Sequence, residues 1–313
     1  MKEIILIGGM PASGKSTLVS QYEKNGYLRI NRDLTGGSYA GQNETVEAAF
    51  KKGISKVVLD NLYINKDSRK SIIALAKSHG ARIECHWMNT SMEDAQYNSA
   101  SRIVKKYKTL LGPKEMREIN DPGMVLPPVV LFKAKKELQK PESSEGFDLV
   151  KTIPFHRNYS AEYKNKAIIF DYDGTLRKTK SGAHFPTNIH DIEILPNRTE
   201  TIQKYIDKGY LILGASNQSG IAKGQLSEEM AKRCFEKTNE LLGHKIDVKY
   251  CSHSVPPIIC YCRKPSSGMG VAFIEEYKLD PSQCIMVGDM TSDETFAKRS
   301  GFKYIHADKF FAQ

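Results

Sequence analysis

The chain alternates between short apolar runs and longer amphipathic stretches, and it does so twice. In the first series, the apolar runs have the length and composition of buried parallel strands, at residues 2–8, 27–31, 56–60 and 81–88. The amphipathic stretches have the spacing of helices, at residues 15–25, 43–52, 66–79 and 92–106. This alternation predicts a parallel sheet that helices cover on both faces.

A second series begins after a polar stretch at 156–166, so we place a domain boundary near residue 158. Residues 126–140 predict one more helix of the first domain, and 147–154 have strand character. The second series predicts further strands, near 167–171, 210–215, 246–250, 284–287 and 303–306, with helices between them. The fold class we expect is α/β, with two doubly wound parallel-sheet domains at 1–158 and 159–313.

Composition narrows the class of protein. With 313 residues, of which 40% are hydrophobic and 26% charged, the chain suits about two globular domains. No window approaches the roughly 18 apolar residues of a membrane-spanning helix, and the N-terminal apolar run is too short for a signal peptide. Six cysteines are too few for a disulfide scaffold, so we expect a reduced, cytoplasmic setting.

The formal net charge of +10 is unevenly distributed. Residues 1–158 hold 25 basic and 17 acidic side chains, and the remainder holds 21 and 19. A basic face attracts a polyanion such as nucleic acid, but a well-solvated surface has the same composition. Charge alone leaves both interpretations open.

The segment Gly9-Met-Pro-Ala-Ser-Gly14-Lys15-Ser16 fits the phosphate-binding pattern G-x-x-x-x-G-K-[ST] between a strand and a helix. Its backbone N–H groups and the helix N-terminus suit the phosphates of ATP or GTP. Lys15 can neutralise the β and γ phosphates, and Ser16 can hold Mg²⁺. The residues assigned to nucleotide binding are Gly9, Ser13, Gly14, Lys15, Ser16 and Thr17.

Further candidates follow this loop in the sequence. Asp33 lies just past the second strand, at the sheet edge where ligands gather, and is the candidate general base for an acceptor hydroxyl. Asp60 ends the third strand; it either serves the metal and the loop or is a helix-cap or turn residue. The basic segment 102–108, with Arg102 as its strongest candidate, either clamps a moving phosphate or is a solvated helix end.

A second motif, Asp171-Tyr-Asp173-Gly-Thr175, directly follows the apolar run at 167–170. Asp171 can attack phosphorus as a nucleophile, and Asp173 can protonate the leaving oxygen and later activate water. Paired acids alone are common in polar loops, but the Gly-Thr ending and the preceding strand make this motif more specific.

This motif resembles that of the haloacid-dehalogenase superfamily, whose members use these residues with Mg²⁺. The resemblance extends to Ser216, which would hydrogen-bond the phosphoryl group, and to Lys264, which would balance the charge of nucleophile and phosphate. The Mg²⁺ ligands that it implies are Asp171, Asp173, Asp289 and Asp293. The short spacing from Asp173 to Ser216 predicts a minimal cap and a site open to a chain end.

Four side chains in the pattern C-x-H-x₆-C-x-C precede Lys264, namely Cys251, His253, Cys260 and Cys262. Three thiolates and one imidazole suit tetrahedral Zn²⁺, which would fix the loop that carries Lys264. Four unliganded side chains in a turn are the alternative. The pattern resembles the zinc loop of the heptose-bisphosphatase and histidinol-phosphatase branch of the superfamily.

Other segments resemble the bifunctional polynucleotide kinase–phosphatases. Residues 31–38, 59–61, 96–102 and 145–155 resemble the 5′-kinase domain, and residues 180–186, 216–221 and 263–269 resemble the 3′-phosphatase domain. The resemblance implies that Asp33 activates the 5′-hydroxyl and that Lys15 and Ser16 serve ATP and Mg²⁺. It also implies that Arg102 clamps phosphate. The chain departs from the phage enzymes at 34–37, where Leu-Thr-Gly-Gly replaces a segment with another Arg.

The resemblance implies an enzyme that heals DNA or RNA ends for a separate ligase, with ATP, Mg²⁺ and structural Zn²⁺ as cofactors. It would phosphorylate 5′-hydroxyls and remove 3′-phosphates through an aspartyl-phosphate at Asp171. Two alternatives stay open. One is a small-molecule kinase fused to a sugar or histidinol phosphatase, which the zinc loop favours. The other is a non-catalytic nucleic-acid-binding adaptor, against which the intact acids and Lys15 argue.

Overall fold

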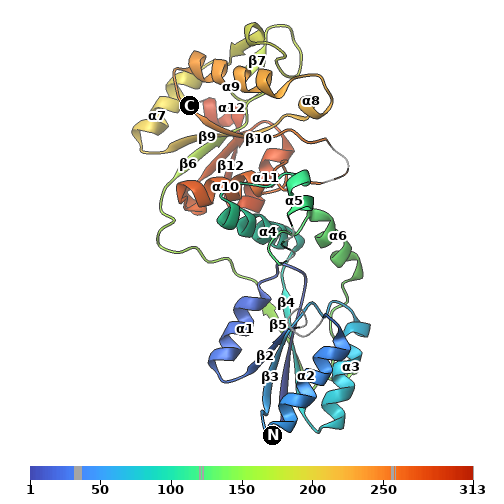
Figure 1. The fold of residues 1–313 in the computed structure, drawn as a ribbon. Helices are drawn as coiled ribbons and strands as arrows, with labels where there is room; N and C mark the ends of the chain where they lie inside the picture. The colour runs from blue at the N-terminus through green and yellow to red at the C-terminus, as the bar shows by residue number, and fades with distance from the viewer. Residues whose placement is uncertain (32–36, 120, 122, 255–256, 258, 313) are drawn as a thin grey trace. The chain divides into compact units, whose positions relative to one another are not determined.

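The computed structural model describes residues 1–31, 37–119, 121, 123–254, 257 and 259–312, which fall into two compact units (Figure 1). The first unit comprises Met1–Asn98 and Val130–Arg157, and the second comprises Ser99–Val129 and Asn158–Gln313. Each unit contains one five-stranded sheet. All strand pairs within these two sheets are parallel, which confirms the predicted α/β class.

The first sheet has the strand order β2-β3-β1-β4-β5. Its strands are β1 (Glu3–Gly8), β2 (Leu28–Asn31), β3 (Lys56–Asp60), β4 (Arg82–Asn89) and β5 (Leu149–Pro154). The central strands are apolar at consecutive positions because both faces of the sheet are covered. Ile4 and Leu6 of β1 face one side, and Ile5 and Ile7 face the other.

Helices cover both faces of this sheet (Figure 1). On one face, α2 (Tyr39–Lys51) and α3 (Lys66–Ser78) pack on the sheet through residues such as Val46 and Ile72. On the other face, Val19 of α1 (Lys15–Lys24) packs against Ile5 and Ile7. The chain continues through α4 (Met92–Tyr107), α5 (Pro113–Glu118) and α6 (Pro128–Glu137), with a short 3₁₀ helix at Ser143–Glu145.

Helix boundaries differ from the expectations at identifiable residues. Helix α2 begins at Tyr39, before the expected residue 43, because Ser38 caps it: the Ser38 Oγ accepts a hydrogen bond from the Gly41 N–H at 2.9 Å. Helix α6 begins at Pro128, within the Pro127-Pro128 pair where we expect its start, since proline suits the first turn of a helix, and it ends at Glu137, before the expected residue 140. Helix α5 was not predicted, because six residues are too few to show a helical period.

The second sheet has the strand order β10-β9-β6-β11-β12. Its strands are β6 (Ala167–Phe170), β9 (Leu211–Asn217), β10 (Asp247–Cys251), β11 (Ile285–Gly288) and β12 (Lys303–His306). A separate antiparallel pair, β7 (Arg177–Thr179) and β8 (Ile192–Ile194), follows β6. The carboxyl ends of β6, β9, β10 and β11 therefore meet at one edge of the sheet, where ligands of such folds bind.

Helices also cover both faces of the second sheet. Phe235 of α9 (Glu228–Leu242) and Phe310 of α12 (Ala307–Phe311) pack with Phe170, and α7 (Arg198–Asp207) joins the same face. The opposite face carries α10 (Gly268–Tyr277) and α11 (Thr291–Ser300) (Figure 1). The remaining short helices are α8 (Ser219–Ala222) and the 3₁₀ turns Ile189–Asp191 and Pro281–Gln283.

Two further features bear on the candidate site. Between Asp173 and Ser216 the chain forms the β7–β8 pair, α7 and β9, and these described residues contain no large cap. Within the described ranges, no helix is both long and apolar enough to cross a membrane.

Candidate functional site

The glycine-rich loop connects β1 to α1 and is tightly packed. Gly9 has φ of 142°, in the region that favours glycine, and a Cβ there would lie 2.9 Å from the Met88 Cβ. The Thr90 Oγ1 donates a hydrogen bond to the buried Ser13 at its carbonyl oxygen, at 3.0 Å. The end of β4 thus fixes the turn whose N–H groups would face a phosphate.

Lys15 folds back over this loop. Its Nζ donates to the Met10 carbonyl oxygen at 2.6 Å and to that of Gly9 at 3.2 Å, and the side chain is buried. In the described part of the chain no side chain caps the N-terminus of α1 after Gly14, and Ser16 and Thr17 are exposed. A helix end in this state is suited to an anion.

Of the two acids expected near the nucleotide, Asp33 and Asp60, the structure describes only Asp60. Asp33 lies outside the described residues. Asp60 is 5% exposed at the end of β3, where its Oδ2 accepts hydrogen bonds from the Arg29 Nη2 and, at 3.3 Å, from the Asn31 Nδ2. Asp60 therefore joins the carboxyl ends of β2 and β3 through an ion pair.

Arg102 belongs to the second compact unit, whereas the phosphate-binding loop belongs to the first. Its role as a clamp at the loop therefore stays a prediction. Two of its basic neighbours have acidic partners within the second unit. The Lys105 Nζ lies 3.4 Å from the Glu275 Oε1, and the Lys106 Nζ lies 2.5 Å from the Asp121 Oδ2.

The second unit brings Asp171, Lys264 and Asp293 together at the carboxyl edge of its sheet. The Lys264 Nζ lies 2.7 Å from the Asp171 Oδ1 and 2.7 Å from the Asp293 Oδ1. The same ammonium donates to the Ala215 carbonyl oxygen at 2.7 Å. The Lys264 side chain is only 2% exposed, so the ammonium contacts both carboxylates away from water.

Three carboxylates at this edge are close enough to share one cation. Asp171, Asp289 and Asp293 each offer an oxygen, and these oxygens lie within 4.8 Å of one another. Gly174 has φ of 86°, and a Cβ there would clash with the Asp289 carboxylate. One lysine cannot balance three acids, two of which are buried, and carboxylate oxygens are the ligands that Mg²⁺ prefers, so this donor set fits Mg²⁺.

Burial and neighbouring charges shift the pKa values of the acids and of Lys264 at this edge of the sheet. Burial raises the pKa of Asp171 to about 7, although the neighbouring Lys264 charge opposes the shift. Burial also raises the pKa of Asp289. For Lys264, burial disfavours the charged form, but Asp171 and Asp293 outweigh it and the pKa is raised. A cation among these carboxylates would favour their ionised forms.

Asp173 is not in this group of three. Its Oδ1 accepts a hydrogen bond from the Arg177 Nε at 2.8 Å, and its Oδ2 accepts one from the Gln218 Nε2 at 3.1 Å. Gln218 also donates to the Oγ of Ser216, which is buried at the end of β9. Neither Arg177 nor Gln218 was predicted from the sequence, although Gln218 lies two residues after Ser216 and Arg177 lies four residues after Asp173.

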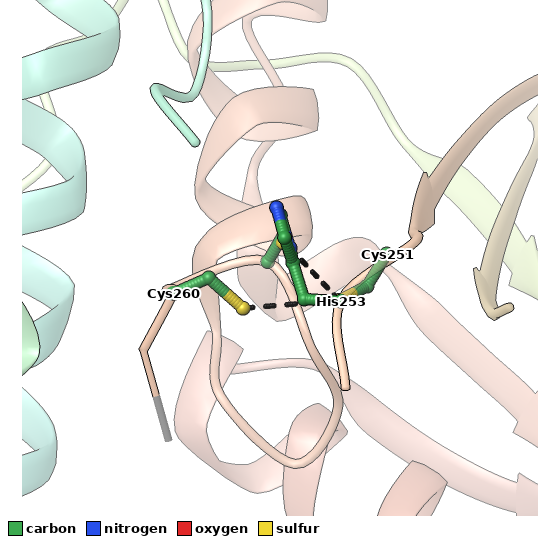
Figure 2. A group of neighbouring side chains, drawn as sticks. Cys251, His253 and Cys260 are labelled. Carbon is green, nitrogen blue, oxygen red and sulfur yellow. Dashed lines mark hydrogen bonds between the residues drawn. The ribbon is translucent and has the colours of Figure 1, made fainter. Parts of the chain in front are cut away.

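The cysteine and histidine side chains converge in one cluster, in which Cys251, His253 and Cys260 point toward one another (Figure 2). The His253 Nδ1 lies 3.4 Å from the Cys251 Sγ and 3.2 Å from the Cys262 Sγ. The Cys251 and Cys260 Sγ atoms are 3.8 Å apart, and all four ligand atoms lie within 4.8 Å of one another. Three free thiols and an imidazole at this spacing fit tetrahedral Zn²⁺.

The cluster is tied to the carboxylate site through the backbone. Lys264 follows Cys262 by two residues, and its N–H donates to the Asn217 Oδ1 at 3.0 Å. The Asn217 Nδ2 donates back to the Lys264 carbonyl oxygen at 3.0 Å. The Gln218 N–H donates to the Cys251 carbonyl oxygen at 2.7 Å. These hydrogen bonds connect the segment that carries Lys264 to Asn217, and they connect Gln218, which contacts Asp173, to the backbone of Cys251 in the cluster.

Comparisons with known proteins match both parts of the chain. Residues 166–313 match the family model described as polynucleotide kinase 3 phosphatase, and residues 4–111 match a model described as an AAA domain. A probable D-glycero-D-manno-heptose-1,7-bisphosphate 7-phosphatase of Thermoplasma volcanium is 36% identical over 139 residues, which cover 43% of this chain and 92% of that protein.

Two further similarities are to a phosphatase/kinase and to a chain of an RNA repair complex. A bifunctional polynucleotide phosphatase/kinase of Schizosaccharomyces pombe is 31% identical over 155 residues, which cover 49% of this chain and 34% of that protein. A chain in the solved structure of the Pnkp1/Rnl/Hen1 RNA repair complex is 18% identical with a TM-score of 0.33, covering 97% of this chain and 95% of that chain.

Proposed function

Because the chain belongs, through residues 166–313, to the phosphatase family that the polynucleotide kinase 3 phosphatase model describes, and carries a P-loop kinase domain before it, we propose that this two-domain enzyme heals nucleic-acid ends. The first domain would move the γ-phosphoryl group of ATP to a 5′-hydroxyl, and the second would remove a 3′-phosphate. The observation that carries the proposal is the presence, in one chain, of the phosphate-binding loop and the Asp171–Lys264–Asp293 cluster.

In the kinase reaction, the loop N–H groups and Lys15 would hold the nucleotide phosphates. Lys15, now bonded to loop carbonyl oxygens, is within the loop that the phosphates would enter. Asp33 would accept the proton of the 5′-hydroxyl. At the same time the hydroxyl oxygen would bond to the γ-phosphorus, and the bond from that phosphorus to the ADP oxygen would break. Arg102 would stabilise the charge on the transferring group.

In the phosphatase reaction, an Asp171 oxygen would bond to phosphorus while the bond to the 3′-oxygen breaks. The 3′-oxygen takes the electron pair and receives a proton from the Asp173 carboxyl group. A water oxygen then bonds to phosphorus while the bond from phosphorus to the Asp171 oxygen breaks, Asp173 takes a proton of that water, and phosphate leaves with the Asp171 carboxylate restored. Mg²⁺ held by Asp171, Asp289 and Asp293 would neutralise phosphate oxygens, and Lys264 would keep Asp171 ionised before attack.

The test uses one DNA and one RNA oligonucleotide, each with a 5′-hydroxyl and a 3′-phosphate and labelled to report both ends. We expect Lys15→Ala to abolish 5′-phosphorylation and leave 3′-dephosphorylation intact, and Asp171→Asn to do the reverse. Each activity should fall by at least about 100-fold, the scale of losing a catalytic group. Lys24→Ala, in the last turn of the same helix as Lys15, and Asp280→Asn, away from the acidic cluster, serve as controls.

If Lys15→Ala leaves 5′-phosphorylation unchanged, the kinase assignment is wrong; if Asp171→Asn leaves 3′-dephosphorylation unchanged, the phosphatase assignment is wrong. The same assay compares DNA with RNA.

A second candidate is a sugar-bisphosphate phosphatase joined to a small-molecule kinase. The 36% identity to the Thermoplasma volcanium protein favours it for the second domain. The two candidates separate in one comparison of kcat/KM between a heptose 1,7-bisphosphate and an oligonucleotide 3′-phosphate. A higher value for the sugar would replace the nucleic-acid proposal.

A further inference from the structure

Arg177 is a buried cation next to the candidate acid–base residue. It begins β7 and is 1% exposed, and its Nε donates to the Asp173 Oδ1 at 2.8 Å. Its guanidinium carbon lies 5.4 Å from the centre of the Tyr172 ring and 5.3 Å from that of Phe235. A guanidinium is costly to bury unless it is paired, and here its ion-pair partner is Asp173.

The other end of this guanidinium is anchored in helix α9. The Arg177 Nη1 donates to the Cys234 carbonyl oxygen at 2.8 Å and to the Thr238 Oγ1 at 2.7 Å. The guanidinium is planar, so anchoring its Nη1 atom in α9 fixes the direction in which the Nε–H points. Arg177 therefore connects α9 rigidly to the Asp173 carboxylate.

Gln218 holds the remaining oxygen. Its Nε2 donates to the Asp173 Oδ2 at 3.1 Å and to the Ser216 Oγ at 2.9 Å. Both carboxylate oxygens thus have a protein donor, and the carboxylate cannot rotate about its terminal torsion without losing one. Each oxygen still has a lone-pair direction available for a proton in transfer.

We propose that Arg177 is a positioning residue for the phosphatase reaction: it holds the Asp173 carboxyl group in the orientation that delivers a proton to the leaving oxygen. The inference rests on the proposed function, since it takes Asp173 as the acid and base. Proton delivery matters most when the leaving group is a strongly basic alkoxide and least when it is a stable phenolate. The fall in kcat that removal of Arg177 causes should therefore depend on the leaving group.

The test compares wild type with Arg177→Met on an oligonucleotide 3′-phosphate and on p-nitrophenyl phosphate. We expect kcat on the oligonucleotide to fall by about 30- to 100-fold, within the range of general acid catalysis, and kcat on p-nitrophenyl phosphate to change by less than about threefold. Arg198→Met is the matched control. The Arg198 Nε donates to the Thr175 carbonyl oxygen at 2.9 Å, so this arginine supports the same loop without contacting Asp173.

An equal loss on both substrates, in a variant that unfolds like wild type, would mean that Arg177 only supports the fold, and no loss on either would also overturn the inference. If Arg177→Met does not fold, Arg177→Lys is the second variant, because it keeps the positive charge but not the planar guanidinium. Its kcat on the oligonucleotide should fall by less than that of Arg177→Met, and its kcat on p-nitrophenyl phosphate should again change little. Wild-type enzyme that hydrolyses p-nitrophenyl phosphate but no oligonucleotide would instead refute the proposed function, and glycerol phosphate then replaces the oligonucleotide in this test.

Discussion

Lys264 determines the charge balance of the phosphatase site. Its ammonium lies 2.7 Å from a carboxylate oxygen of Asp171 and 2.7 Å from one of Asp293, and all three side chains are nearly excluded from water. Removing one partner of a buried ion pair leaves an uncompensated charge, which costs more than the pair itself contributes. The residue should therefore matter for folding as well as for chemistry.

We expect Lys264→Met to lower the free energy of unfolding by about 3 kcal/mol and to remove measurable phosphatase activity. Chemical denaturation measures the first effect and phosphate release the second. Added Mg²⁺ should stabilise the variant more than it stabilises wild type, because a cation among the acids substitutes for the lost charge. Lys278→Met, with a side chain 43% exposed, should change stability by less than about 0.5 kcal/mol. Equal stability of both variants would contradict the role of Lys264.

At the scale of elements, the buried strands were predictable and the short elements were not. The apolar runs at 2–8, 56–60 and 167–171 are all strands, since a strand covered on both faces must be apolar at every position. The β7–β8 pair escaped prediction because three-residue strands show no period. Helix α5 escaped for the same reason.

Motif residues at strand ends were also predictable, since parallel strands bring their carboxyl ends to one edge. The resemblance to the haloacid-dehalogenase superfamily anticipated the convergence of Asp171, Asp289 and Asp293, and this rule gives its physical reason. It did not anticipate Arg177, whose contacts reach α9, or the ion pair of Asp60 with Arg29. Such contacts depend on tertiary packing, which the local pattern does not encode.

The segment between β10 and α10 carries the candidate zinc site. We propose that its cluster of Cys251, His253, Cys260 and Cys262 binds one Zn²⁺, which holds the segment that positions Lys264. Purified protein should contain about one zinc per chain by metal analysis, as a tetrahedral site requires. Cys262→Ser should lose the zinc, lower the midpoint of thermal unfolding, and reduce phosphatase activity by about tenfold or more.

Cys284→Ser is the matched control for this substitution, because Cys284 is buried in the same unit but lies outside the cluster. It should keep the zinc. Wild-type protein without bound zinc, prepared without chelator and with zinc in the medium, would refute the site.

At the scale of the whole molecule, the uneven charge predicts different responses of the two reactions to salt. Residues 1–158 carry 25 basic and 17 acidic side chains, whereas the remainder carries 21 and 19. Acidic partners already engage Lys105 and Lys106, so only part of this excess is available to a bound polyanion. A protein that neutralises phosphates releases counterions from the nucleic acid, and its affinity then falls with salt.

With about three phosphate contacts to a single strand, the KM of the kinase for an oligonucleotide should rise about tenfold or more between roughly 50 and 200 mM salt. The KM of the phosphatase for a 3′-phosphate should rise less, because its domain is nearly neutral and a buried lysine and carboxylates dominate its site. A nucleoside 3′-phosphate as 5′-kinase acceptor is the control, since it has no polymer counterions to release. If the oligonucleotide and the nucleotide show the same weak salt dependence, the positive charge of the first domain only solvates its surface and does not bind the chain of phosphates.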